Sequence, residues 1–177
     1  MDMEVKIIDT TKPLKIKNSI VYPLGMCCQD IDDDFVNEQI LCIGDDCTKK
    51  RIITGTFDKF GQAKVKACIG VGHTMAEVSA VIDTGAYYTC INNSIAEQLG
   101  AKKISASKSS TPYGVHEMPV YMMNYVIDEC FSQNFVSEVR GIDFKDVQML
   151  IGTQFLTQYC EFKYYGRENR FELVINP

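Results

Sequence analysis

One carboxylate in the chain is placed where it could take part in acid–base chemistry. The apolar run at 80–82 is typical of a buried strand, and it leads directly into Asp83, Thr84, Gly85 and Ala86. A charge that follows a buried strand is costly unless it is paired or hydrogen-bonded, so we expect Asp83 to have a specific partner. Gly85 can adopt backbone conformations that other residues resist, and the Thr84 hydroxyl can both donate and accept hydrogen bonds. These residues predict a tight turn that presents one carboxylate.

A second segment has the features of a support for this turn. Leu150 and Ile151 end an apolar run, Gly152 follows them, and residues 155–159 continue with a helical pattern of apolar side chains. A glycine between a buried strand and a helix indicates that another part of the backbone passes very close to it. We therefore expect a chain segment to lie against Gly152.

Short strands are expected to dominate residues 51–177. Apolar residues alternate with polar ones, or form short runs, between turn signals. A small polar segment at 108–114 lies between two extended stretches and predicts a hairpin with a mobile tip. The expected strands are 51–57, 63–71, 76–82, 103–107, 119–127, 135–139, 161–164 and 171–175.

One short helix is predicted after the Asp83 turn. Ser94 and Glu97 have the spacing of a capping box, in which the first side chain bonds the N-terminal amides of the helix. Ile95 and Leu99 would share one face, and Gly100 is well placed to end the helix.

Residues 1–50 carry weaker signals. Alternation of apolar and charged residues predicts strands at 4–8 and 14–17. The acidic run at 30–34 favours the start of a solvated helix over a calcium loop, because it lacks the glycine and the terminal glutamate of an EF-hand.

The eight cysteines are interpreted as reduced thiols, because their spacing is irregular and no export signal accompanies them. Cys27, Cys28, Cys42 and Cys47 depart from the two short pairs that form a structural zinc site, so small buried hydrophobes are the favoured interpretation. Cys90, which lies just beyond the Asp83 turn, is likewise expected to be a buried thiol and not a nucleophile.

Overall composition argues against several classes of function. A formal charge of -5 and the absence of a broad Lys/Arg cluster disfavour nucleic acid as a partner. No apolar run approaches the roughly 20 residues needed to cross a bilayer, so we expect no membrane association. Asp2 and Glu4 lie where a signal peptide would carry basic residues, and we therefore expect a cytoplasmic protein.

The order of the Asp83 turn and the Gly152 segment resembles that of the retropepsin-like aspartic proteases, the retroviral and retroelement type that also has bacterial members. In that family an apolar-apolar-Gly segment passes against the Asp-Thr-Gly turn, and a hairpin flap covers the cleft. The resemblance implies an all-β fold with one or two short helices. It implies a single-lobe acid-protease barrel at 51–177, preceded at 1–50 by an N-terminal extension of unclear role.

The resemblance also implies roles for individual residues. Asp83, Thr84 and Gly85 would form the catalytic turn, and Thr84 would hydrogen-bond across a dimer. The residues implied as structural support of the site are Leu150, Ile151 and Gly152. The residues implied as substrate-binding are Ala86 beside the turn, and Thr111, Pro112, Tyr113 and Gly114 in the flap.

A chain of 177 residues with one such triplet has room for one lobe, so a homodimer must supply the second aspartate. Two carboxylates about 3 Å apart cannot both ionise, so one can activate a water while the other donates a proton to the peptide carbonyl. The predicted activity is that of an aspartic endopeptidase acting on peptide or protein substrates, with no metal and no cofactor. The alternative is a catalytically inactive dimeric binding or scaffold domain with the same fold.

Overall fold

A computed structural model describes residues 5–9, 14–16, 19–21, 50–111, 114–128 and 135–176. Three of the expectations above fall outside these residues. They concern the four cysteines between 27 and 47, the helix start at 30–34, and Pro112 and Tyr113 of the flap.

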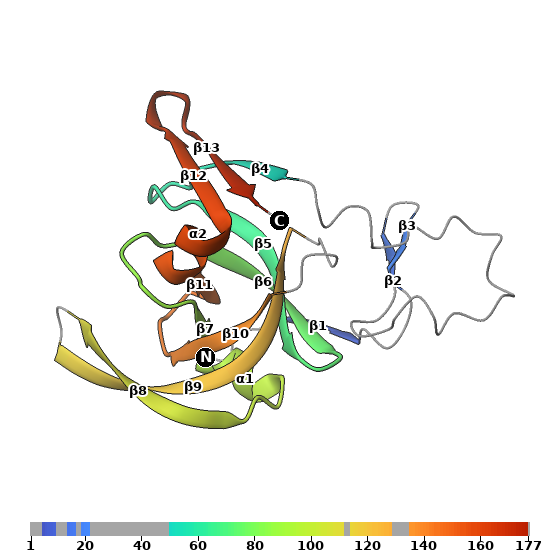
Figure 1. Ribbon diagram of the computed structural model, residues 1–177, viewed down its shortest axis with the longest axis vertical. Helices are drawn as coiled ribbons and strands as arrows, with labels where there is room; N and C mark the ends of the chain where they lie inside the picture. Colours follow the sequence, from blue (N-terminus) through green and yellow to red (C-terminus); the bar gives the residue numbers. More distant parts are fainter. Residues whose placement is uncertain are drawn as a thin grey trace, which may run out of the picture.

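The fold is built on a closed ring of six strands (Figure 1). In order around the ring the strands are β6 (Thr74–Ile82), β11 (Met149–Ile151), β7 (Cys90–Asn92), β10 (Phe135–Ile142), β9 (Gly114–Ile127) and β5 (Lys64–Val71), which pairs again with β6. Strand β11 is parallel to β6, and β10 is parallel to β7; the other neighbours are antiparallel. Because the ring is closed, its strands have no exposed edges, apart from the parts of strands that extend beyond the ring and pair with strands outside it.

Two further strands extend this sheet. Strand β1 (Lys6–Asp9) pairs with the first half of β6, on the edge that β11 continues. Strand β8 (Lys103–Thr111) pairs with β9 and forms the long curved hairpin that projects from the ring in Figure 1. Strands β2 (Leu14–Ile16) and β3 (Ser19–Val21) pair with each other. The predicted strands at 4–8 and 14–17 are thus confirmed within a residue or two.

The paired part of the hairpin is longer than predicted. Residues 108–111, expected in a mobile loop, continue β8, and Thr111 pairs with Gly114. Strand β9 likewise begins at Gly114 and not at Pro119, which lies just beyond the last residue of β9 that pairs with β10. The loop was predicted because residues 108–111 are small and polar. Their backbone groups nevertheless pair with β9, so they form part of the strand.

The core lies inside the ring, where alternate residues of each strand point inward. These side chains are apolar, and their burial supplies most of the stabilisation of the fold. The largest fully buried ones on the ring are Ile69, Ile91, Met123, Tyr125, Ile127, Met149 and Ile151.

Helix α1 (Asn93–Gln98) begins two residues earlier than predicted, because its cap is Asn92 and not Ser94. The Asn92 side chain accepts a hydrogen bond from the Ser94 N–H at 3.1 Å, so Ser94 lies inside the helix. The predicted capping box of Ser94 and Glu97 is therefore wrong. Asparagine caps as well as serine does, and Asn92 lies two residues before Ser94. Gly100 has φ +66° and ends the helix as predicted.

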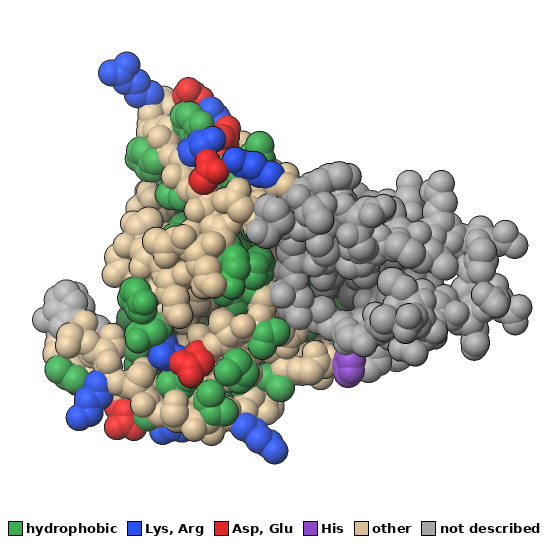
Figure 2. Space-filling model, in the orientation of Figure 1, with side chains coloured by type: hydrophobic (Ala, Val, Ile, Leu, Met, Phe, Trp, Pro, Cys, Tyr) green, Lys and Arg blue, Asp and Glu red, His purple; other side chains and the backbone are tan. Residues whose placement is uncertain are grey.

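Helix α2 (Thr153–Tyr159) follows β11 directly and leads into a separate three-stranded sheet. Its strands, in spatial order, are β12 (Cys160–Tyr165), β13 (Arg170–Ile175) and β4 (Arg51–Thr56), with the 3-10 turn η3 (Gly166–Glu168) between β12 and β13. Figure 2 shows charged side chains of both signs gathered at this end of the molecule, where Arg170 pairs with Glu168 and Glu172. Among the described residues, neither α1 nor α2 is long and apolar enough to span a bilayer.

Phe171 is expected to contribute strongly to stability, because it joins this sheet to the core. It is 0% exposed, its ring packs against Phe57 and Phe162, and a Cβ on Gly55 would lie 2.7 Å from its Cε1 atom. We predict that Phe171→Ala lowers the free energy of unfolding by about 3–5 kcal/mol in denaturant titrations.

The matched control is Phe60→Ala. Phe60 is 75% exposed, so its loss should change the free energy of unfolding by only about 0.5 kcal/mol. Equal effects of the two substitutions would contradict the assigned packing of Phe171.

Candidate active site

Asp83 lies at the C-terminal end of β6, where the strand gives way to a turn. Its backbone N–H donates to the Ile151 carbonyl at 3.0 Å, so the turn starts directly beside β11. Asp83 is half-buried, and its Oδ1 accepts a hydrogen bond from the Gly85 N–H at 2.8 Å. The Ala86 N–H donates to the Asp83 carbonyl at 3.3 Å and closes the turn. The specific partner of the carboxylate is therefore a backbone amide of its own turn.

Gly85 leaves room for the Asp83 carboxylate, and its backbone is not unusual. Its φ does not lie in the left-handed region that favours glycine, so the expectation of an unusual backbone conformation is wrong. A Cβ at this position would instead lie 3.2 Å from Asp83 Oδ1, which is tight. Space beside the carboxylate is thus the constraint. Thr84 is exposed next to it, where its hydroxyl can meet a partner.

Gly152 meets another backbone, as the sequence predicts. A Cβ on Gly152 would lie 2.6 Å from the Tyr87 carbonyl oxygen and closer still to that of Tyr88. Any side chain at this position would therefore push the loop of residues 83–89, the Asp83 loop, away from β11. The Gly152 N–H faces Thr89 Oγ1 at 3.5 Å, at the far end of the same loop.

The N-terminus of α2 is capped by the Asp83 loop. Its N-cap residue is Gly152, which has no side chain that could cap the helix. The Thr153 and Gln154 N–H groups donate to the Ala86 and Tyr87 carbonyls, each at 2.8 Å, and Thr153 Oγ1 donates to the Ala86 carbonyl at 3.1 Å. These bonds satisfy donors that a helix end leaves free, and they fix the loop at the same time. Ala86, predicted to leave room for substrate, is also part of this anchor.

Leu150 and Ile151 lie in β11, between β6 and β7. Leu150 pairs with Val81 and Ile151 with Ile82, in parallel, so the two predicted segments run side by side. Ile151 points into the core and is fully buried, whereas Leu150 belongs to a second, outer cluster with Val81 and Cys90. The structure thus brings the predicted supporting residues together with Asp83.

A cavity of about 460 Å³ opens beside Asp83 and Thr84. Its floor is formed by β6 and Leu150, and its walls are largely aromatic. The remaining lining residues are Phe57, Gly61, Gln62, Ala63, Val81, Ile82, Phe144, Val147, Phe162 and Tyr164. A cavity of this size can bind an apolar side chain, and a polar group next to that side chain would then lie beside the carboxylate.

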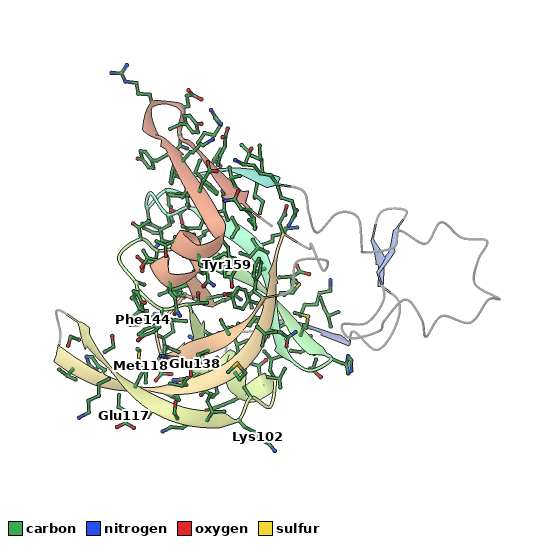
Figure 3. All side chains as sticks on the ribbon, viewed as in Figure 1. Lys102, Glu117, Met118, Glu138, Phe144 and Tyr159 are labelled. Atoms are coloured by element: carbon green, nitrogen blue, oxygen red, sulfur yellow. The ribbon has the colours of Figure 1, made fainter. Side chains whose placement is uncertain are left out.

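Of the residues predicted to form a flap, the structure describes Thr111 and Gly114. Thr111 and Gly114 form the last described pair of the β8–β9 hairpin, and no described hairpin residue lines the cavity. Nearer the ring, Met118 packs against the outer cluster that contains Val81 and Leu150. In Figure 3 Met118 lies on the hairpin, and Phe144 lies between the hairpin and α2. The inner part of the hairpin therefore covers the outer face of the site.

Arg140, which was not among the predicted site residues, supports the loop from β10. Its backbone N–H donates to the Thr89 carbonyl at 3.0 Å, and its buried guanidinium lies 4.1 Å from the centre of the Tyr88 ring. Both terminal nitrogens of the guanidinium lie 3.1 Å from Glu138 Oε2. A cation stacked on this ring restrains the segment that passes Gly152.

Cys90 is buried, as predicted. Burial raises the pKa of its thiol to about 11, although the positive charge of Arg140 opposes the shift. A protonated thiol is a poor nucleophile, which favours a packing role. Among the described residues, no group of three or more His, Cys, Asp or Glu side chains could hold a metal ion.

The ring topology and the paired Asp83 and Gly152 segments define a retropepsin-like fold. The structure is similar to a retropepsin-like aspartic protease from Rickettsia conorii, with a TM-score of 0.54 and 17% identity over 72% of this chain and 94% of that chain. This similarity shows the fold, and the predicted all-β retropepsin-like architecture is confirmed.

Two other solved structures also match, at lower TM-scores. One is the EIAV protease in complex with the inhibitor HBY-793, with a TM-score of 0.47 and 12% identity over 59% of this chain and 93% of that chain. The other is the protease of simian foamy virus (mac), with a TM-score of 0.40 and 19% identity over 54% of this chain and 92% of that chain. No protein-family model and no curated protein sequence matches the chain.

Gly152→Ala tests the contact between β11 and the loop. The added methyl group would meet backbone atoms of Tyr87 and Tyr88, which cannot rotate away. We predict a loss of about 1–3 kcal/mol or more in the free energy of unfolding, measured by denaturant titration.

Gln158→Ala is the control, because Gln158 is an exposed residue of α2 and alanine favours helix. Its free energy of unfolding should stay within about 0.5 kcal/mol of the parent value. If Gly152→Ala were equally silent, the close approach of the two backbones would be refuted.

Proposed function

We propose that this protein is an aspartic endopeptidase that hydrolyses peptide bonds with a pair of Asp83 carboxylates from two copies of the chain. The observation that carries the proposal is the Asp-Thr-Gly turn itself, held against Gly152 in a fold like that of the Rickettsia conorii aspartic protease. A half-buried carboxylate at the edge of an apolar cavity adds to this support.

A second copy of the chain is needed because the lobe supplies one such turn. In a two-fold dimer, equivalent residues meet near the axis, so Asp83 would lie beside its counterpart. Thr84 is exposed next to Asp83, and its hydroxyl would bond the opposite turn. The bonds from Gly85 and α2 would keep each turn rigid while the dimer forms.

The two carboxylates would then divide the chemistry between them. At about 3 Å from each other they hold one proton, because both cannot be ionised at that distance. The ionised carboxylate takes a proton from a water molecule, and that water attacks the peptide carbonyl carbon. The protonated carboxylate donates its proton to the carbonyl oxygen, and a tetrahedral intermediate forms. Breakdown of the intermediate with proton transfer to the amide nitrogen releases two peptides, and no acyl-enzyme forms.

The cavity indicates the type of substrate. Its walls carry Phe57, Phe144, Phe162 and Tyr164, and its floor is aliphatic. A large apolar side chain next to the scissile bond would bury its surface there, which contributes roughly 1.5–3 kcal/mol for a fully buried residue.

Asp83→Asn should abolish cleavage of a peptide library and leave the fold intact. Asparagine has a similar shape but cannot act as a base, and loss of acid–base catalysis lowers rates by about 10²–10⁴-fold or more. Retained circular dichroism and thermal unfolding would separate this from misfolding.

Activity should pass through a maximum at mildly acidic pH. At low pH both carboxylates are protonated and no base remains; at high pH both are ionised and no acid remains. If the purified parent protein cleaves nothing between about pH 4 and pH 7, the range expected for such pairs, the binding or scaffold function takes its place.

The proposed site also requires a dimer. Sedimentation velocity at micromolar concentration should give a species of twice the chain mass, in both the parent protein and Asp83→Asn. A parent protein that is monomeric under conditions in which it cleaves peptides would exclude the paired-aspartate mechanism.

A further inference from the structure

Asn92 lies at the junction of β7 and α1, and every hydrogen-bonding group of its side chain is used. It is 6% exposed. Its Oδ1 accepts from the Ser94 N–H at 3.1 Å and from Ser94 Oγ at 2.8 Å, on the helix side. Its Nδ2 donates to the Phe144 carbonyl at 3.0 Å and to the Val147 carbonyl at 3.2 Å, on the other side. An amide side chain offers two donors and two acceptor positions, so none is left over.

The two carbonyls belong to the turn that forms one wall of the cavity beside Asp83. Phe144 and Val147 lie at its two ends, and both side chains line the cavity. One amide nitrogen thus holds both ends of the turn from inside the fold. Asp146, between them, has φ +66°, a conformation uncommon outside glycine that persists where the surroundings fix it.

We propose that Asn92 is a positioning residue that holds the turn 144–147 at a set distance from Asp83 and thereby determines which side chain the cavity accepts. The specificity part of this inference rests on the proposed protease function. The positioning part concerns the turn alone.

The two aromatic walls of the cavity are held in different ways. On the side of the three-stranded sheet, Phe57 packs against Tyr164 with ring centres 4.6 Å apart, so those rings restrain each other. Phe144 is 52% exposed and forms no aromatic pair with any described residue. The position of its ring therefore follows from its backbone, which Asn92 holds.

Other hydrogen bonds hold the residues on either side of the turn, Asp143 and Gln148, and leave the turn 144–147 itself to Asn92. The Asn93 side chain donates to Asp143 Oδ1 at 2.9 Å, and Gln148 Oε1 accepts from the Ser79 N–H at 2.7 Å. The Asn92 N–H also donates to the Gln148 carbonyl at 2.9 Å. Loss of the Asn92 side-chain donors should therefore free residues 144–147 while the flanks stay attached.

Asn92→Asp separates the two roles of this side chain, which are to cap α1 and to hold the turn 144–147. Aspartate caps helices as well as asparagine does, so α1 keeps its acceptor. An ionised aspartate has no hydrogen to donate to the two carbonyl oxygens, and a protonated one has a single hydrogen, so it cannot bond both. Asn92→Ser is the second variant, because it also caps α1 but is too short and has too few donors to bond both carbonyls.

Ser94→Ala is the matched control. It removes the hydroxyl that donates to Asn92 Oδ1 and leaves both bonds to the turn in place. A general weakening of α1 would affect this control as well as the Asn92 variants.

The first measurement is amide hydrogen exchange across residues 143–149, which needs no activity. We expect exchange at least about tenfold faster in Asn92→Asp and Asn92→Ser than in the parent protein, with little change in Ser94→Ala. Unchanged exchange in both Asn92 variants would overturn the positioning role.

The second measurement compares two peptides that differ only in the residue beside the scissile bond, phenylalanine or alanine. The parent protein should prefer phenylalanine in kcat/KM, and Asn92→Asp should reduce that ratio by about tenfold or more. Phe144→Ala should reduce the ratio similarly without accelerating exchange at 145–149, because Asn92 remains.

The outcomes of the two measurements are distinct. A parent protein that cleaves neither peptide overturns the specificity role together with the protease function, while exchange still decides whether Asn92 holds the turn. A parent protein that cleaves, with an Asn92→Asp variant of unchanged preference, overturns the specificity role alone.

Discussion

The fold depends on the passage of one backbone through a gap that only glycine leaves open. Strand β11 lies between β6 and β7, parallel to the first and antiparallel to the second, and its exit at Gly152 touches the carbonyls of Tyr87 and Tyr88. Because buried backbone groups must be paired, this contact determines the partners of the Asp83 amide and of the first amides of α2. The position of the carboxylate follows from those bonds.

The candidate site is therefore held mainly by main-chain hydrogen bonds. Carbonyls of Ala86 and Tyr87 cap α2, and a main-chain amide bonds the Asp83 carboxylate. Such bonds do not depend on which side chains are present, so the turn can persist while the surrounding cavity changes. Side chains hold the parts that main-chain pairing does not. Asn92 bonds the turn that forms one wall of the cavity, and Arg140 stacks on Tyr88 where the loop crosses β10.

Local signals in the sequence predicted much of this structure. Alternation and turn residues located the ring strands β5, β6, β9 and β10, and Gly152 after an apolar pair predicted the close approach, because each depends on neighbouring residues only. The helix cap could not be chosen in this way. Asn92 and Ser94 are both good caps, and the choice is made by carbonyls more than 50 residues along the chain.

Other features escaped prediction for a similar reason. Arg140 stands in an alternating strand, where a charged residue is expected to face solvent; the Tyr88 ring and Glu138 explain its burial, and neither pairing is visible in the sequence. Gly85 was expected to have an unusual backbone conformation. The constraint is space instead, because a Cβ would lie close to the Asp83 carboxylate oxygen, whose position the sequence does not show. The extent of the β8–β9 hairpin likewise depends on pairing that a polar composition conceals.

The parallel pairing of β11 with β6 has a consequence for how the molecule forms. The paired residues are about 70 positions apart, and such long-range pairings close late and slowly during folding. During synthesis, the Asp83 turn leaves the ribosome well before the strand and helix that hold it in place. The carboxylate therefore has no fixed geometry until residues 149–159 have emerged and docked. A protein with this arrangement acquires its site in the step that closes the ring of strands, so a chain interrupted earlier carries the triplet without the site.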